Sequence, residues 1–364
     1  MKIKNIITYL EEIAPLCYQE SYDNSGLLVG DKESEVTSVL IALDCTEEIL
    51  EEAINNKCNL VITHHPLIFS KLSKITGSNH TERIIIRAIK HDISIYAIHT
   101  NLDNIYYGVN HRISQRLGLI NTEILSYKNN ILMQLVLYAP KKNTEEIQRA
   151  LFDAGAGNIG RYKECSFISE GTGTFFPLES AKPEIGSKGK RNLADEQRIS
   201  VVFPRSLRFQ ILRAMKEAHP YEEVAYQLYT LENYNQHVGA GMIGYLPKPI
   251  HASDFLQDLK RKMQTENIRH SNILDRKIKK VAVCGGSGSF LIKEAKCLDA
   301  DIFITSDMKY HDFFLAENKI ILADIGHYES EQFTKDLIYN LLVKKFTKFA
   351  ILLSKINTNP IKYL

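Results

Sequence analysis

Apolar, strand-favouring runs alternate with helix-like segments at both ends of this chain, and that alternation restricts the fold more than any other feature. Near the N-terminus, SVLIALD (38–44), NLVITHH (59–65) and ISIYAIHTNLD (93–103) predict strands, and the segments 46–57 and 80–92 predict the helices between them. A strand–helix–strand order favours parallel pairing, because parallel neighbours need a long crossover. The sequence therefore predicts an α/β sheet here.

The same order returns near the C-terminus, where KKVAVCGGSGS (279–289), DIFITSD (301–307) and IILADIGHYESE (320–331) predict three more strands. When the two ends are laid over each other without a gap, Val39 falls on Val281. Identities are few, so two βαβ units could also have converged on this pattern. We interpret the ends as two pseudo-repeated α/β units that form one domain.

The middle of the chain has its own alternation. Strands are predicted at 131–140, 198–204 and 224–233, a hairpin-like pair at 164–176, and helices at 144–155 and 206–218. The order βαββαβ predicts a ferredoxin-like α+β domain. We therefore expect an inserted domain at 126–249 within a discontinuous α/β domain formed by 1–125 and 250–364.

Composition excludes some functions and suggests a compartment. The net charge of +2 and the scattered basic residues argue against a nucleic-acid or anionic-membrane surface, and no run approaches the ~18–20 apolar residues of a membrane span. The six cysteines show no CxxC spacing, and most sit in apolar stretches. They read as reduced structural thiols of a cytoplasmic protein.

Polar residues collect where the predicted strands end. In parallel α/β sheets, ligands bind beyond the carboxyl ends of the strands, so these side chains are the candidates for a functional site. The positions are Thr63, His64, His65, His99, Thr100, Asn101, Asp103, Ser306, Asp307, Tyr310, His311, Asp324, His327, Glu329 and Glu331.

The spacing of five of these residues indicates metal binding. His64 and His65 can both reach one centre if the strand has ended, which Pro66 favours by restricting the preceding residue. His327 and Glu331 are four apart and share one face if a helix begins there, and Asp103 supplies a carboxylate able to bridge. Imidazole and carboxylate together suit zinc, iron, manganese or nickel.

Other readings of single residues stay open. A lone histidine is more often solvated or hydrogen-bonded than a metal ligand, and we treat the histidines without acidic companions as structural. The segment GGSGS (285–289) could cradle an anion with its amides, but it lacks the known phosphate-loop spacings and fits a tight packing turn equally well.

Seven segments together have a familiar pattern. They are SYDNSGLLVGD (21–31), ALDCT around Asp44, THHPLIF (63–69), HTNLDN (99–104), SDMKYHD (306–312), ADIGHYESE (323–331) and NTNPIKYL (357–364). In this order they resemble the Nif-three-like dinuclear metal-centre family, whose members are named GTP cyclohydrolase 1 type 2 homologues. The resemblance covers about 1–125 and 250–364, and the middle looks like the PII-type or CutA-type insert of the longer members.

The resemblance implies a two-metal site and an assembly. Matched residue by residue, the family's ligands for two divalent ions fall on His64, His65, Asp103, His327 and Glu331, with Glu331 as the bridge. It further implies a toroidal homohexamer whose metal sites line an internal cavity.

Two functions follow as hypotheses. The first is a metal-dependent hydrolase using a metal-bound hydroxide; the family name suggests attack on C8 of the guanine ring of GTP, so the substrate could be a nucleotide. His99, Asp307 and His311 would then orient ligands or act as acid/base groups. The alternative is a non-catalytic hexamer for metal trafficking or regulation, with a ligand-sensing insert.

Overall fold

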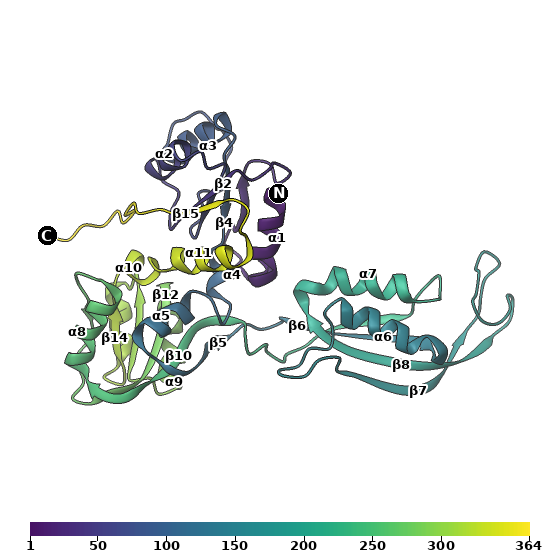
Figure 1. The fold of residues 1–364 in the computed structure, drawn as a ribbon. Helices are drawn as coiled ribbons and strands as arrows, with labels where there is room; N and C mark the ends of the chain where they lie inside the picture. Colours follow the sequence, from purple (N-terminus) through teal and green to yellow (C-terminus); the bar gives the residue numbers. More distant parts are fainter. The chain divides into compact units, whose positions relative to one another are not determined.

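Strand pairing organises the chain into three β-sheets that belong to two structural units. The computed structural model describes residues 1–364. Met1–Tyr127 together with His237–Leu364 form the first unit, which contains two sheets, and Lys128–Gln236 form the second, which contains one (Figure 1). The mixed α/β class predicted from the sequence is confirmed.

The first sheet of the first unit has five strands in the order β1-β4-β3-β2-β15. The strands β4, β3, β2 and β15 run parallel to one another, and β1 pairs antiparallel with β4. Every residue of β2, β3 and β4 is buried, as expected for parallel strands covered on both faces. The bounds are β1 (Gly26–Val29), β2 (Ser38–Ala42), β3 (Leu60–Thr63), β4 (Ser94–Ala97) and β15 (Ala350–Leu353).

The helices around this sheet begin where their sequences provide caps. The side chain of Thr46 accepts a hydrogen bond from the Ile49 amide at the start of α2, and that of Asn79 accepts one from the Glu82 amide at the start of α3. Apolar residues of α2 and α3 pack with those of β2, β3 and β4 in one core. The helices of this half are α1 (Ile3–Ile13), α2 (Glu47–Asn55), α3 (His80–Lys90), α4 (Thr100–Asp103) and α5 (Val109–Leu117).

The second sheet has six strands in the order β11-β14-β13-β12-β10-β5. Its three central strands are parallel, and β10 pairs antiparallel with both β12 and β5. The bounds are β5 (Ile120–Tyr127), β10 (Gly239–His251), β11 (Arg269–His270), β12 (Lys277–Ser287), β13 (Ile302–Ser306) and β14 (Ile321–Asp324). Its helices are α8 (Ala252–Met263), α9 (Ile292–Cys297), α10 (His327–Glu331) and α11 (Thr334–Lys345), with a 3₁₀ helix at Tyr310–Ala316.

Corresponding strand pairs in the two sheets are aligned in the same way. Val39 of β2 lies opposite Leu60 of β3, and Val281 of β12 lies opposite Ile302 of β13. When the two ends of the sequence are laid over each other, Val39 falls on Val281, and Leu60 falls on Ile302 in the same alignment.

The second unit contains one antiparallel sheet in the order β7-β8-β6-β9. Its elements follow the order βαββαβ: β6 (Leu132–Pro140), α6 (Thr144–Asp153), β7 (Ser166–Phe175), β8 (Asn192–Pro204), α7 (Arg208–Ala218) and β9 (Tyr226–Thr230). Both helices contribute apolar side chains to one core with the sheet. Residues 239–249, which were expected in the insert, belong to β10 of the first unit.

One local prediction in this unit is wrong. Residues 166–175 are not a hairpin-like pair but a single strand, β7, which pairs along its whole length with β8 from Ser166 opposite Val201 to Phe175 opposite Asn192. Strand β8 therefore begins six residues before the predicted strand at 198. The sequence signal was weak because β7 has no buried residue to give an apolar period and carries Gly171 and Gly173, which are unfavourable in strands.

None of the helices has both the length and the apolar character that crossing a bilayer requires.

Packing predicts the effect of truncating an aromatic residue in the second unit. Phe203 of β8 is fully buried in its core, so Phe203→Ala should destabilise the unit by about 3–5 kcal/mol. Phe209 of α7 is 83% exposed, so Phe209→Ala should change stability by no more than about 0.5 kcal/mol. Urea denaturation followed by circular dichroism compares the two variants, and equal shifts would contradict this assignment of the core.

Candidate metal centre

The five predicted ligands come from strand ends of both sheets in the first unit. His64 and His65 follow β3 directly, and Asp103 is the last residue of α4, which follows β4. His327 and Glu331 are the first and last residues of α10, which follows β14. The helix that was needed to bring His327 and Glu331 onto one face is therefore present.

His64 is fully buried and its ring is oriented by the backbone. Its Nδ1 lies 2.8 Å from the carbonyl oxygen of Ile98. A carbonyl only accepts, so Nδ1 carries a proton, and the neutral form of the ring has its lone pair on Nε2. That Nε2 lies 3.5 Å from Oδ1 of Asp103 and 3.8 Å from Oε1 of Glu331.

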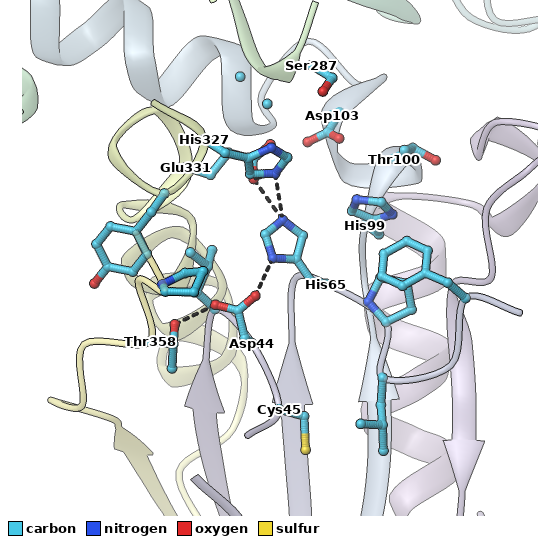
Figure 2. Close-up of a pocket in the computed structure, with 18 of the residues that line it drawn as sticks. Asp44, Cys45, His65, His99, Thr100, Asp103, Ser287, His327, Glu331 and Thr358 are labelled. Atoms are coloured by element: carbon cyan, nitrogen blue, oxygen red, sulfur yellow. Dashed lines mark hydrogen bonds and ion pairs between the residues drawn. The ribbon is translucent and has the colours of Figure 1, made fainter. Parts of the chain in front are cut away.

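His65 and His327 converge on the same carboxylate from opposite sheets. The Nε2 atoms lie 2.8 Å (His65) and 3.0 Å (His327) from Oε2 of Glu331, and 3.2 Å from each other. Their Nδ1 atoms each lie 2.6 Å from a further carboxylate, Asp44 for His65 and Asp307 for His327. Figure 2 shows His65 between Asp44 on one side and His327 with Glu331 on the other.

The charges in this cluster shift its titration. Burial alone would lower the pKa of His65, but hydrogen bonds to Asp44 and Glu331 raise it to about 9. Burial would also lower the pKa of His327, but the negative charge of Glu331 and the hydrogen bond to Asp307 together raise it to about 11. Burial disfavours ionised Glu331, yet the positive charge and hydrogen bond of His327 hold its pKa well below its usual range. Burial raises the pKa of Asp103.

Three groups of side chains have ligand atoms close enough together to hold a metal ion. They are His65, His327 and Glu331; His64, Asp103 and Glu331; and His64, His65 and His99. The first two share Glu331.

The donor atoms fit a divalent cation. Nε2 of His64 and Oδ1 of Asp103 are buried and have no hydrogen-bond partner in the protein, which is costly unless something else satisfies them. In addition, both ring nitrogens of His65 and of His327 face carboxylates. A metal ion between the Nε2 atoms and Glu331 would take the place of the protons that these nitrogens carry there. Imidazole and carboxylate donors of this kind suit zinc and other first-row metals.

Three residues that support the cluster were given no role at the site from the sequence, although each lies in a segment that carries the family resemblance. Asp44 follows β2 at the same edge of the sheet, and the rule about strand ends could have identified it; the hydroxyl of Thr358, in the C-terminal segment, donates to its other oxygen. Asp23 accepts from Nδ1 of His99 at 2.7 Å and from the Thr100 hydroxyl. Asp23 lies in an irregular loop, for which strand periodicity offered no signal.

The three residues predicted to orient ligands or move protons lie in different places. His99 is next to the cluster, with its ring centroid 5.2 Å from that of His64. Asp307 holds His327 and has a left-handed backbone, with φ of 55°, an arrangement that is uncommon outside glycine and often marks functional positions. His311 instead packs against Tyr310 and Phe314 in the 3₁₀ helix, so the geometry gives it no role in the cluster.

The glycine-rich segment at 285–289 serves packing. The amides of Gly285 and Gly286 donate to Oδ1 of Asn110 and Oγ of Ser330, each at 2.9 Å. Gly286 has φ of 61°, and a Cβ there would clash with the carboxylate of Glu331. Of the two readings left open by the sequence, the tight turn is the one these contacts support.

A cavity of about 1030 Å³ opens beside the cluster, and His65, His99, Asp103, His327 and Glu331 form part of its wall (Figure 2). The C-terminal segment closes another side through residues 358–361. The candidate metal centre is therefore accessible to a small molecule.

The fold and the site define a mixed α/β protein with a candidate His/carboxylate metal centre at the strand ends of two sheets. The chain belongs to the Duf34/NIF3 (NGG1p interacting factor 3) family, whose profile matches residues 1–360.

Relatives of this chain match it over its whole length. A Bacillus subtilis protein named GTP cyclohydrolase 1 type 2 homolog is 37% identical over 371 residues, which cover 99% of this chain and 98% of that one. A protein of the same name from Halalkalibacterium halodurans is 36% identical over 374 residues, covering all of both chains. The crystal structure of a Bacillus cereus protein related to NIF3 is 38% identical, covers 100% of this chain and 99% of its own, and superposes with a TM-score of 0.85.

Metal binding should depend on pH in a defined direction. His65 and His327, whose pKa values are raised to about 9 and 11, are protonated at pH 7, and a metal ion must displace those protons. Affinity should therefore fall as pH is lowered, with about two protons released per protein at pH 7. Calorimetric titration of the metal-free protein with Zn²⁺ in two buffers of different ionisation enthalpy counts the protons; no proton release would contradict this assignment.

The carboxylate behind His65 should strengthen metal binding. Asp44→Asn keeps an oxygen that can accept from Nδ1 of His65 but removes the charge, so Zn²⁺ affinity should fall by about 10- to 100-fold. The matched control is Asp92→Asn, an exposed position with φ of 52° that asparagine also tolerates, which should leave affinity unchanged. An Asp44→Asn variant that binds as tightly as the control would remove Asp44 from the site.

Proposed function

We propose that this protein is a metal-dependent hydrolase whose reaction takes place in the cavity beside the His/carboxylate cluster. The observation that carries the proposal is the convergence of His65 and His327 on the buried carboxylate of Glu331, at the wall of an open cavity of about 1030 Å³. Perturbed titratable groups that meet in a cleft are typical of catalytic sites. The names of the curated relatives point to the same class.

We further propose that the cluster holds two divalent ions with Glu331 as the shared ligand. One ion would be held by His64, Asp103 and Glu331, and the other by His65, His327 and Glu331. Zinc, iron, manganese and nickel all accept this donor set. A divalent ion bound there supplies Lewis-acid polarisation of a substrate oxygen and lowers the pKa of water.

The residues of the chain would prepare the site for hydrolysis. The Ile98 carbonyl, Asp44 and Asp307 each fix Nδ1 of one histidine, so that all three Nε2 atoms face inward. His99 donates its Nδ1–H to Asp23, which leaves the lone pair on Nε2 free to take a proton from the attacking water and return it to the leaving group. Hydrolysis adds the elements of water across the cleaved bond, so this transfer balances the protons.

We also propose the internal repeat, the inserted domain, the cellular location and the assembly that the sequence led us to expect. The matching registers of β2 with β3 and of β12 with β13 support two pseudo-repeated α/β units. The βαββαβ order and antiparallel sheet of Lys128–Gln236 support an inserted ferredoxin-like domain of PII or CutA type. All six cysteines are free thiols, which supports a reducing, cytoplasmic location. A toroidal homohexamer rests on the family resemblance alone.

Turnover by metal-loaded protein tests the proposal. The protein, purified with its native metal, is incubated with GTP, guanosine, phosphoesters and uncharged esters and amides. His65→Ala and Glu331→Ala should each reduce the rate at least about 100-fold and lower metal content, because each removes a group at the centre of the cluster.

Two exposed residues far along the sequence from these ligands serve as controls: His91→Ala and Glu12→Ala should retain full rate and metal content. Full metal occupancy with no turnover on any compound would refute the hydrolase and favour a non-catalytic metal carrier. Unchanged metal content in both site variants would show that the ligands are assigned wrongly.

A further inference from the structure

The wall of the cavity is rich in carboxylates and has no lysine or arginine. Six carboxylates line it: Glu20, Asp44, Glu47, Glu48, Asp103 and Glu331. Arg83 reaches the wall from outside it, with its Nη2 2.7 Å from Glu47. Two divalent ions and Arg83 would bring five positive charges against the five negative charges of Asp44, Glu47, Glu48, Asp103 and Glu331, so even the loaded cavity would have no surplus positive charge.

The helix starts beside the cavity are already capped by the protein's own side chains. At α2, the Thr46 side chain accepts from the Ile49 amide, and the Thr46 hydroxyl and a backbone amide hold the carboxylate of Glu48. At α3, Asn79 accepts from the Glu82 amide, and the carboxylate of Glu82 accepts from the amides of Thr76 and Ser78. Phosphate groups usually bind such helix starts, but here carboxylates take that place.

The glycine-rich segment offers an anion no better place. The amides of Gly285 and Gly286 donate to Asn110 and Ser330 inside the fold. The usual binding elements for a polyphosphate, basic side chains and free loop amides, are thus replaced by carboxylates and satisfied amides.

Three aromatic side chains in the same wall are exposed although they are large. Tyr22 is 70% exposed, Phe69 56% and Phe290 62%. The ring of Phe69 meets that of His99 edge to face, with centroids 5.8 Å apart, so it lies directly beside the cluster. Exposed aromatic rings in a cavity favour a ligand that presents a flat ring of its own.

From these observations we infer that the cavity binds an uncharged compound with a flat ring and discriminates against nucleoside triphosphates, although the curated relatives carry the name of a GTP-using enzyme. The inference rests on the proposed function insofar as the bound compound is taken to be the substrate of a hydrolase. Binding of the compound can be measured whether or not it is hydrolysed. It narrows the substrate to molecules such as neutral heteroaromatic rings or their nucleosides. A triphosphate would add negative charge with nothing in the wall to balance it.

Guanosine and GTP form a matched pair for the test, because they share the ring and sugar and differ in the phosphates. Calorimetric titration of the metal-loaded protein, with MgCl₂ in excess of GTP, should give a dissociation constant for guanosine at least about tenfold lower than that for GTP at low salt. The difference should narrow at high salt because ions screen the repulsion.

Variants separate the two parts of the inference. Glu48→Lys should improve GTP binding by at least about threefold, and Phe69→Ala should weaken guanosine binding by about tenfold. Glu12→Lys, an exposed charge change on α1, and Phe209→Ala, an exposed ring in the second unit, are the controls and should change neither constant.

Tighter binding of GTP than of guanosine, or no binding of guanosine, would overturn the inference. Selective guanosine binding without turnover of any compound would refute only the hydrolase, whereas turnover combined with tighter GTP binding would refute only the inference.

Discussion

The buried carboxylate of Glu331 is the group on which the functional region depends. A charged group that is 2% exposed is costly unless cations or donors surround it, and Glu331 obtains them from His327 on its own helix and from His65 on the other sheet. Each of those histidines is held in turn by a further carboxylate, Asp307 or Asp44. The strand ends of the two sheets therefore meet around one negative charge.

That arrangement explains neighbouring features that would otherwise be unrelated. Gly286 must lack a side chain because Glu331 occupies the adjacent space, and the left-handed backbone of Asp307 directs its carboxylate to His327. Thr358 of the C-terminal segment donates to Asp44 and so connects the last residues of the chain with His65. The chain thus stabilises the candidate ligands through partners from widely separated parts of its sequence, as is typical of metal sites in which a second layer orients the first.

Sequence patterns predicted the elements that have strong periodicity and failed where the signal was local or absent. The all-apolar strands β2, β3 and β4 and the cap of α2 at Thr46 could be read directly, because burial on both faces leaves a continuous hydrophobic run. Strand β7 was predicted as a hairpin-like pair because none of its residues is buried and two of them are glycines, which are typical of turns. His311 was grouped with the site because it follows β13, yet the 3₁₀ helix directs it to Tyr310 and Phe314.

The sequence by itself determined the α/β class and which residue types gather at the strand ends, because hydrophobic period and strand termination are local properties of the chain. Only the tertiary structure decided which of those side chains share a centre, which nitrogen of each histidine faces it, and that Asp23, Asp44 and Thr358 support it. The charge of the cavity also belongs to this second group. The chain as a whole carries a net charge of only +2, and the excess of carboxylates arises because folding brings together residues from 20 to 331 that are scattered along the sequence.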